Sequence, residues 1–336
     1  MSYQVTDPHT ITARPLGQDE HDRWQAFLAR SNNGTLFHDL DFLAYHPPDR
    51  FDTHHLVFES GGRLLALLPG ATLRDGRRRR VLRSPYGATI GGLVLPPAPP
   101  AQEVLALVRR LVDYARGLGL KAMEIILPPA QFHRVPDHTQ EFALAACGFT
   151  PVQVWLQHVI RLPADPAQVI PGLPDRRRRT AVRAAAKKGV SLRIGSPADL
   201  PAYHALLSAN RQRHGKAPVH SLKELYRLYE LVPDRLRLFL CEFQGKLIGG
   251  SLFFEHHPGL AHSFAPCYDR ATKNLGATLA VTVAAMEYYA ARGVRLLDMG
   301  GSTFDDYSFN PGVTAFKESL GGIGLTRTLY RWTDDA

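Results

Sequence analysis

Four basic side chains recur along one short segment at the spacing of a helical face. In the run Arg-Arg-Arg-Arg-Thr-Ala-Val-Arg-Ala-Ala-Ala-Lys they are three or four residues apart: Arg176, Arg179, Arg183 and Lys187. Such residues line one side of an α-helix. A one-sided row of this kind suits successive phosphates, because arginine binds a phosphate through two parallel hydrogen bonds. The row would bind RNA or another phosphorylated molecule, and a solvated surface helix is the alternative that the spacing leaves open.

The net charge agrees with a polyanionic partner without identifying one. The chain of 336 residues has 40 basic and 31 acidic residues, which gives a net charge of +9. An excess of this size favours RNA, a nucleotide substrate or an anionic membrane surface. An arginine-rich composition with a solvated surface explains it equally well.

Cysteines and histidines indicate no metal chemistry. The three cysteines are far apart and have no Cys-x-x-Cys spacing, so we expect reduced, mostly buried thiols at Cys147, Cys241 and Cys267. Two histidine pairs are adjacent in sequence, and neighbours on a strand point to opposite faces, so they cannot chelate as an i, i+4 helical pair does. We predict no metal and no cofactor.

Length and composition predict two folded domains without a membrane segment. Hydrophobic residues make up 45% of the chain and charged residues 21%, which is ordinary for a globular protein. No apolar run approaches the roughly 20 residues that span a bilayer, and the polar N-terminus lacks the apolar core of a signal peptide. We therefore expect a cytoplasmic protein.

The elements that must position the basic row occur twice along the chain. Residues 54–69 and 237–254 each predict strand, tight turn and strand, with Gly62-Arg63 and Gly245-Lys246 at the turns. A starting helix, a later amphipathic helix that ends near a glycine, and a further strand complete each half. These are expected at 20–30, 101–117 and 122–127, and at 199–213, 277–292 and 294–299.

Repetition of helix, antiparallel hairpin, helix and strand is an α+β pattern. Chance similarity of two α/β halves is the alternative. The proline-rich segment 96–100 comes too early to be the domain boundary, so we expect a surface loop of the first domain there. Prolines cluster again between 163 and 174, and we place the boundary near 150–175. We expect domains at 1–160 and 161–336.

Helix, hairpin, helix, strand is the middle of the GNAT (acyl-CoA N-acyltransferase-like) fold, and tandem copies of it resemble the Fem family. The basic segment from Arg176 to Lys187 resembles a helix that opens the second domain in that family. Asp298-Met-Gly-Gly-Ser, and then Asn-Pro-Gly-Val-Thr-Ala-Phe-Lys-Glu-Ser-Leu-Gly-Gly from residue 310, resemble its closing signature. The resemblance covers nearly the whole chain, but the long charged helical arm of some members is missing. It implies two tandem GNAT domains, each a mixed central sheet flanked by helices, with the donor site in the second.

The resemblance also assigns roles at the C-terminal end. In the Fem family a Phe-Lys pair is associated with the end of aminoacyl-tRNA, which places Lys317 and Phe316 in the acyl or terminal-ribose region. An ammonium there would stabilise the oxyanion that develops on the ester carbonyl. A surface lysine beside a core phenylalanine is the alternative. Asp298 would hold the acceptor ammonium or take its proton, and a cap on the Gly300-Gly301 turn is the other reading of this aspartate.

Several further residues are candidate contacts for the two substrates. His262 and Tyr268 precede the expected donor loop as site walls, and Asp305 follows the last strand. Because the acceptor of Fem-like enzymes binds in an interdomain cleft, Arg83 and Tyr86 of the first domain are also candidate acceptor contacts. In the donor loop, Lys273 and Gly276 keep the cation and glycine of a phosphate-binding helix start but not the full spacing of a CoA signature. A capped helix start is the alternative.

These patterns predict an aminoacyltransferase that moves an amino acid from aminoacyl-tRNA to an amine and forms an amide. The acceptor would be a peptidoglycan precursor or a small natural-product intermediate, and no DNA partner is expected. No Ser/His/Asp triad is evident, as expected for a site that works by positioning. An acyl-CoA-dependent N-acyltransferase of the same fold and a non-catalytic tRNA- or nucleotide-binding protein remain the alternatives.

Overall fold

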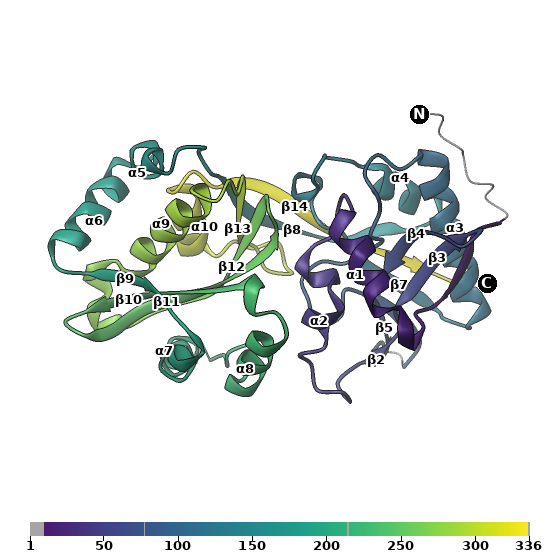
Figure 1. Cartoon of the computed structure of the whole chain (residues 1–336), viewed down its shortest axis with the longest axis horizontal. Coiled ribbons are helices and arrows are strands. Elements are labelled where there is room, and N and C mark those ends of the chain that lie inside the picture. Colours follow the sequence, from purple (N-terminus) through teal and green to yellow (C-terminus); the bar gives the residue numbers. More distant parts are fainter. Residues whose placement is uncertain (1–9, 77, 214, 335–336) are drawn as a thin grey trace. The chain divides into compact units, whose positions relative to one another are not determined.

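The computed structural model describes residues 10–76, 78–213 and 215–334. The chain forms two compact units (Figure 1): unit 1 is Met1–Trp155 with Thr326–Ala336, and unit 2 is Leu156–Leu325. Two strands cross from one unit to the other along the chain, β8 (Thr150–Arg161) and β14 (Ile323–Thr333). The expected division placed residues 161–336 in one domain, whereas the last strand packs mostly with unit 1.

The described residues of unit 1 form two sheets and four α-helices. The sheets have the strand orders β1-β3-β4 and β2-β5-β6-β7-β14. The helices are α1 (His21–Arg30), α2 (Leu40–Leu43), α3 (Ala101–Gly117) and α4 (Thr139–Ala146). The strands are β1 (Thr12–Pro15), β2 (Asp52–Thr53), β3 (Leu56–Ser60), β4 (Arg63–Leu68), β5 (Ala71–Arg74), β6 (Arg80–Ser84) and β7 (Ala122–Ile126).

The division of unit 1 into two sheets arises at one proline. Strands β4 and β5 are separated only by Pro69 and Gly70, and proline cannot donate to a ladder. One hydrogen bond bridges the break, from the amide of His54 to the carbonyl of Gly70 at 2.7 Å. The hairpin β3–β4, expected from the sequence, is confirmed, but it belongs to the smaller sheet. Its counterpart in unit 2, the hairpin of residues 236–257, stays in the main sheet of that unit.

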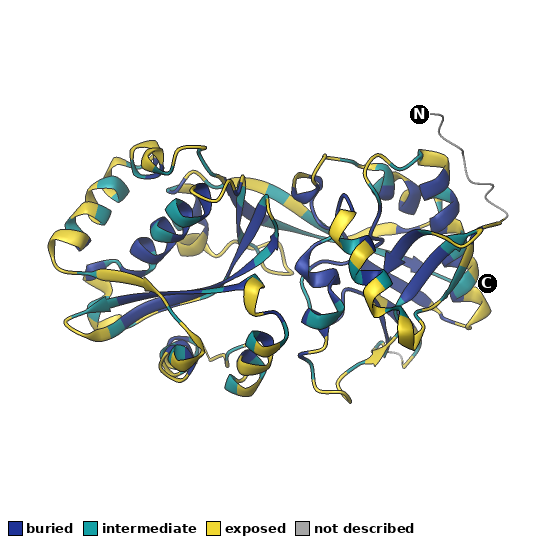
Figure 2. Ribbon diagram, viewed as in Figure 1, coloured by how far each residue is buried: buried dark blue, intermediate teal, exposed yellow. Residues whose placement is uncertain are grey.

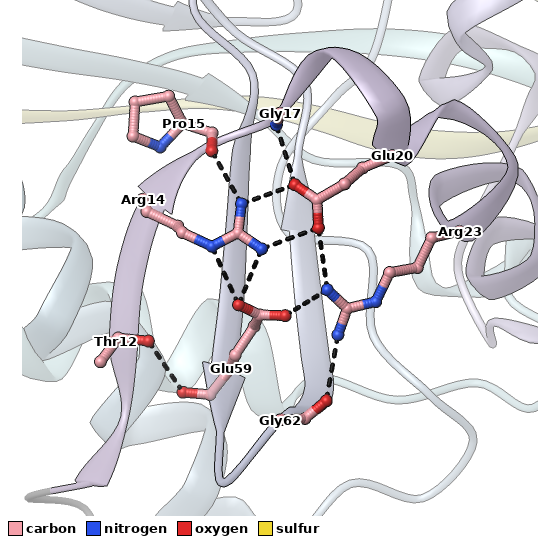
Figure 3. Close-up of polar contacts among 8 residues, drawn as sticks. All are labelled: Thr12, Arg14, Pro15, Gly17, Glu20, Arg23, Glu59 and Gly62. Atoms are coloured by element: carbon pink, nitrogen blue, oxygen red, sulfur yellow. Dashed lines mark hydrogen bonds and ion pairs between the residues drawn. The ribbon is translucent and has the colours of Figure 1, made fainter.

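An ion-pair network fastens α1 to the smaller sheet of unit 1 (Figure 3). Arg14 on β1 donates to both oxygens of Glu20, at 2.6 and 2.7 Å, and to Glu59 on β3 at 3.0 Å. Arg23 pairs with both carboxylates and donates to the carbonyl of Gly62. The guanidinium of Arg14 lowers the pKa of Glu20 to about 2. Two carboxylates and two guanidinium groups thus compensate one another, which makes this cluster a structural feature of unit 1.

Unit 2 has one sheet of order β8-β13-β12-β11-β10-β9. Its strands are β9 (Ser191–Ile194), β10 (Leu236–Phe243), β11 (Lys246–His257), β12 (Leu260–Tyr268) and β13 (Leu296–Gly301). Its helices are α5 (Val169–Gly172), α6 (Arg176–Lys187), α7 (Leu200–Gln212), α8 (Leu222–Leu231), α9 (Ala277–Ala290) and α10 (Pro311–Glu318). The β12–β13 pair is parallel, and the other pairs for which a register is known are antiparallel.

Helices cover both faces of this sheet. Helix α9 is buried nearly all round and packs with Phe239, Phe253 and Leu297 in the main core of unit 2. Because side chains alternate along a strand, Leu252 and Phe254 face the other side, where α7 and α8 lie (Figure 1). In Figure 2, α6 is mostly exposed and α9 mostly buried, as a solvated basic helix and a core helix require.

Each repeat receives its last strand from a distant part of the chain. In unit 1, β7 pairs with the far end of β14, and in unit 2, β13 pairs with the far end of β8. The segment that follows the first repeat therefore completes the second sheet, and the segment that follows the second repeat completes the first. The predicted helices and strands of both repeats are confirmed, and the structure is α+β with mixed sheets.

Candidate active site

Strands β12 and β13 begin as parallel neighbours and then part. The described pairing covers three positions only, ending where His262 lies opposite Asp298, although both strands continue. On its other side β12 carries a bulge, where Ala265 and Pro266 oppose Ser251, and Ala265 has a positive φ of 53°. Strain of this kind concentrates at functional positions. Beyond His262 and Asp298 the described pairing of the two strands ends, and we call the place where they part the mouth.

A histidine and an aspartate meet at the point where the strands part. His262 Nδ1 lies 2.7 Å from Asp298 Oδ2, and both side chains are buried. The carboxylate accepts from Nδ1–H, so Nε2 carries the lone pair of the neutral ring. The other oxygen of Asp298 accepts from the amide of Gly300 at 2.8 Å. Asp298 therefore caps the turn, one of the two readings that the sequence offered, and it also orients His262, which the sequence did not indicate.

Lys317 reaches the same turn from the opposite face of the sheet. Phe316 of α10 and Leu320, which follows that helix, pack in the core cluster that contains residues of α9. Lys317 Nζ donates to the carbonyls of Gly300 and Gly301 at 2.7 and 2.6 Å. Its third bond goes to Ser302 Oγ at 3.1 Å.

Burial governs the chemistry of this lysine. Lys317 is 4% exposed, which excludes a surface lysine. Desolvation lowers the pKa of the ammonium to about 8, and the charge of Asp298 opposes part of that effect. All three hydrogens are used within the turn, so Lys317 holds the end of β13 in place and brings a positive charge close to the mouth.

Two residues that the sequence did not single out complete this network. His158 on β8 lies 2.7 Å through Nδ1 from Ser302 Oγ, and Ser302 in turn accepts from Lys317. Burial and the charge of Lys317 lower the pKa of His158. A signal was present in each case: His158 is a polar residue within an apolar strand, and Ser302 closes the Gly-Gly-Ser run.

Phe316 connects α10 to the basic helix. Its half-buried ring lies under the guanidinium of Arg178, 5.4 Å from the ring centre, and Arg178 Nε donates to Ser319 Oγ at 2.9 Å. The first turn of α6 therefore packs against the helix that carries Lys317. Arg178 was not predicted, because it lies outside the row of residues three or four apart.

The predicted basic row lies on α6 as expected, with one member partly engaged. Arg176, Arg183 and Lys187 are exposed, while Arg179 is half-buried and donates to the carbonyl of Leu173. Asp175 caps the helix by accepting from the amide of Arg177 at 2.8 Å. Three cations thus reach solvent along the helix that begins beside α10.

The donor-loop and wall residues lie near the far end of β12. Tyr268 ends that strand half-exposed, under the guanidinium of Arg213 at 5.1 Å. Lys273 is exposed in the 3-10 segment Arg270–Leu275, and Gly276 takes a left-handed conformation at the start of α9. Asp305 is exposed in the loop after β13.

The two candidate acceptor residues of unit 1 serve local contacts there. Arg83 donates through Nε to the buried Glu124 at 2.8 Å, and Glu124 also accepts from Arg331. Tyr86 is buried, its hydroxyl lies 3.1 Å from His55 Nε2, and burial raises its pKa. The exposed part of Arg83 is the more accessible of the two for a substrate.

Comparison with known proteins matches this site region to a domain family. Residues 175–318 match the family described as "Acetyltransferase (GNAT) domain", a segment that starts at the cap of α6 and ends just after Lys317. Solved structures of other proteins are similar to this chain in fold over both units. FemX has 12% identity and a TM-score of 0.74, with 96% of this chain and 97% of that chain covered. The chain is a tandem GNAT-fold protein.

Two further solved structures share the tandem GNAT fold over most of their length. A "Tandem GNAT protein from the clavulanic acid biosynthesis pathway" has 16% identity and a TM-score of 0.58, covering 96% of this chain and 98% of that one. L-PGS from Bacillus licheniformis has 11% identity and a TM-score of 0.59, covering 94% and 92%. No curated protein sequence matches the chain significantly. At these identities the likeness is one of fold.

The described part of the chain contains neither a membrane-spanning helix nor a metal-binding cluster. Within residues 10–76, 78–213 and 215–334, no helix is both long and apolar enough to cross a bilayer. The same residues contain no cluster of three or more His, Cys, Asp or Glu side chains that could hold a metal ion. The candidate site described above contains a His–Asp pair and a buried lysine that bonds to backbone carbonyls.

Proposed function

We propose that this protein transfers an amino acid from aminoacyl-tRNA to an amine acceptor and forms an amide bond. The acceptor is a peptidoglycan precursor or a small natural-product intermediate. One observation carries the proposal: the helix that holds Lys317 at the mouth also packs, through Phe316, against the first turn of the basic helix α6. A phosphate-binding face and a candidate acyl-transfer site are thereby joined in one unit. The fold shared with FemX agrees with the resemblance to the Fem family, from which this donor was expected.

The proposed reaction needs few groups because the donor ester is already activated. The amine nitrogen attacks the ester carbonyl carbon, a carbon–nitrogen bond forms, and the bond to the oxygen of the terminal ribose breaks. His262 Nε2, oriented by Asp298, accepts the proton of the amine, and that proton passes to the departing ribose oxygen. Backbone amides at the mouth and the charge of Lys317 stabilise the oxyanion between these steps. Exposed cations of α6 hold the tRNA backbone.

The test is transfer of a labelled amino acid. Purified protein is incubated with total tRNA charged with a radiolabelled amino-acid mixture and with a panel of amines. We expect label to move to an amine in the presence of protein and to stop moving after ribonuclease treatment. Label that moves equally well after ribonuclease treatment would contradict the proposal.

A second candidate is an acyl-CoA-dependent N-acyltransferase. It rests on the start of α9, where Gly276 turns the chain and leaves the first amides of a 14-residue helix next to the exposed Lys273. Such a helix start attracts a pyrophosphate. Micromolar binding of acetyl-CoA by calorimetry, together with no tRNA-dependent transfer, would favour this candidate. Binding of tRNA without turnover of either donor would indicate a non-catalytic protein.

A further inference from the structure

A small cavity lies beside the bulge of β12, on the face of the sheet that α7 and α8 cover. Its volume is about 50 Å³. The walls come from α7, from the segment between α7 and α8, from α8 and from β12: Tyr203, Leu207, Arg211, Val219, His220, Leu225, Phe264 and Ala265. Most of these side chains are apolar, and Leu207 and Leu225 are buried. The cavity therefore suits a short hydrocarbon group.

Arg211 gives this apolar cavity one permanent charge. The side chain is half-buried, and no described residue offers its guanidinium a hydrogen bond or an ion pair. The hydroxyl of Tyr203 donates to the carbonyl of Ala265 at 2.8 Å, and the ring of His220 packs edge-on against Phe264. A guanidinium in this position lacks an anion, and guanidinium binds a carboxylate in a planar, two-bond arrangement.

The cavity is close to the reacting centre. Phe264 follows His262 by two residues, so both side chains are on the same face of β12, and their ring centres are 6.4 Å apart. Ala265, the strained residue of the bulge, is the next wall residue. Two residues of strand span about 7 Å. A group three or four bonds from the attacked carbonyl or the attacking amine would therefore reach the cavity.

We infer that the cavity binds a substrate carboxylate carried on a short apolar stem, with Arg211 as its partner. The inference rests on the proposed function and adds a substrate class to it. A carboxylate fits a space of this size better than a phosphate, which is bulkier and more strongly hydrated. The carboxylate belongs either to the transferred amino acid, as in an aspartyl or glutamyl group, or to the amine acceptor. Uncharged side chains would leave Arg211 without a partner, which disfavours them.

Binding tests the cavity independently of any transfer. Butyrate and its neutral analogue butyramide are titrated into the full-length protein by NMR, with the Arg Nε–H signals observed. We expect butyrate to shift the Arg211 signal, identified by its absence in Arg211→Leu, and butyramide to bind at least tenfold more weakly. Arg227→Leu is the matched control, because Arg227 is exposed on α8 and pairs with Glu230. Equal binding of butyrate by Arg211→Leu, or of both probes by the wild type, would overturn the inference.

Transfer then identifies which substrate carries the carboxylate. In one arm the donor is tRNA charged with aspartate or glutamate against asparagine or glutamine; in the other, amine acceptors with and without a carboxylate are compared. We expect kcat/KM to favour the acid in one arm at least tenfold, and Arg211→Leu to remove that preference while Arg227→Leu keeps it. A preference for neutral substrates in both arms would refute the inference. No RNA-dependent transfer at all would instead refute the proposed function, and the butyrate titration would still decide the cavity.

Discussion

Substitution of Lys317 by methionine gives the sharpest test of the candidate site. Methionine has nearly the length of lysine but neither its charge nor its donors, so it removes three hydrogen bonds to Gly300, Gly301 and Ser302. It also removes the cost of burying an ammonium. Hydrogen bonds from a charged donor contribute about 2 kcal/mol each, and the relief of burial offsets part of their loss. At pH 7 we expect Lys317→Met to be about 2 kcal/mol less stable than the wild type.

The pH dependence has a definite sign. Burial lowers the pKa of Lys317 from 10.5 to about 8 in the folded protein. Between pH 8 and 10.5 the unfolded chain therefore binds more protons at this position than the folded one, so the free energy of unfolding rises with pH. That difference in pKa corresponds to about 3 kcal/mol. We expect the stability gap between the wild type and Lys317→Met to widen by about this amount across that range.

The assay is chemical denaturation at several pH values between 7 and 10.5. All three tryptophans, Trp24, Trp155 and Trp332, belong to unit 1, so unfolding of unit 2 is followed by far-ultraviolet circular dichroism. Other groups titrate in the same range, but their contributions to stability cancel when the wild type and Lys317→Met are compared. Lys273→Met, at an exposed position, is the control, and its gap should stay constant with pH. A gap for Lys317→Met that stays constant or narrows would refute the reasoning.

Three further predictions concern the His262–Asp298 pair, the basic helix α6 and the ion-pair network of unit 1. Asp298→Asn removes the acceptor that orients His262, and we expect kcat/KM for transfer to fall about 100-fold without loss of circular dichroism; an unchanged rate would exclude the pair from proton transfer. Arg183→Ala should weaken tRNA binding and reduce the slope of log Kd against log salt by about one. The control is Arg177→Ala, at an exposed position of α6 outside the basic row. An equal loss of tRNA affinity in both variants would contradict a one-sided binding face. The pKa of Glu20 is lowered from 4.5 to about 2, so its stabilising effect is complete above pH 4.5 and is lost as the pH falls toward 2. Unfolding followed by tryptophan fluorescence should show this loss of stability in the wild type and much less of it in Glu20→Gln.

The outcome for Lys317 also changes how activity data should be interpreted. A direct role of Lys317 in the reaction would make Lys317→Ala lose transfer. Because the side chain is buried and bonded to three acceptors, the same substitution should also destabilise unit 2. Loss of transfer therefore counts as evidence for a direct role only under conditions where the variant is shown to be folded.

Local sequence determined the repeated elements and the face of the basic helix. Apolar spacing predicted α3, which begins at Ala101 and ends at Gly117, because a helix with one buried stripe repeats its apolar residues every three or four positions. Glycine turns predicted both hairpins for a similarly local reason. The row from Arg176 to Lys187 was readable because four basic residues at this spacing lie on one side of any helix.

Only the tertiary structure decided which residues meet. His262 and Asp298 are 36 residues apart, and they form a pair because β12 and β13 are parallel neighbours in this register. Lys317 was predicted, but its burial and its three acceptors depend on how α10 packs, and His158 joins them only because β8 pairs with β13. No local signal reports such pairing, since each strand is compatible with many partners. Local sequence thus set the elements, and long-range packing made a site from them.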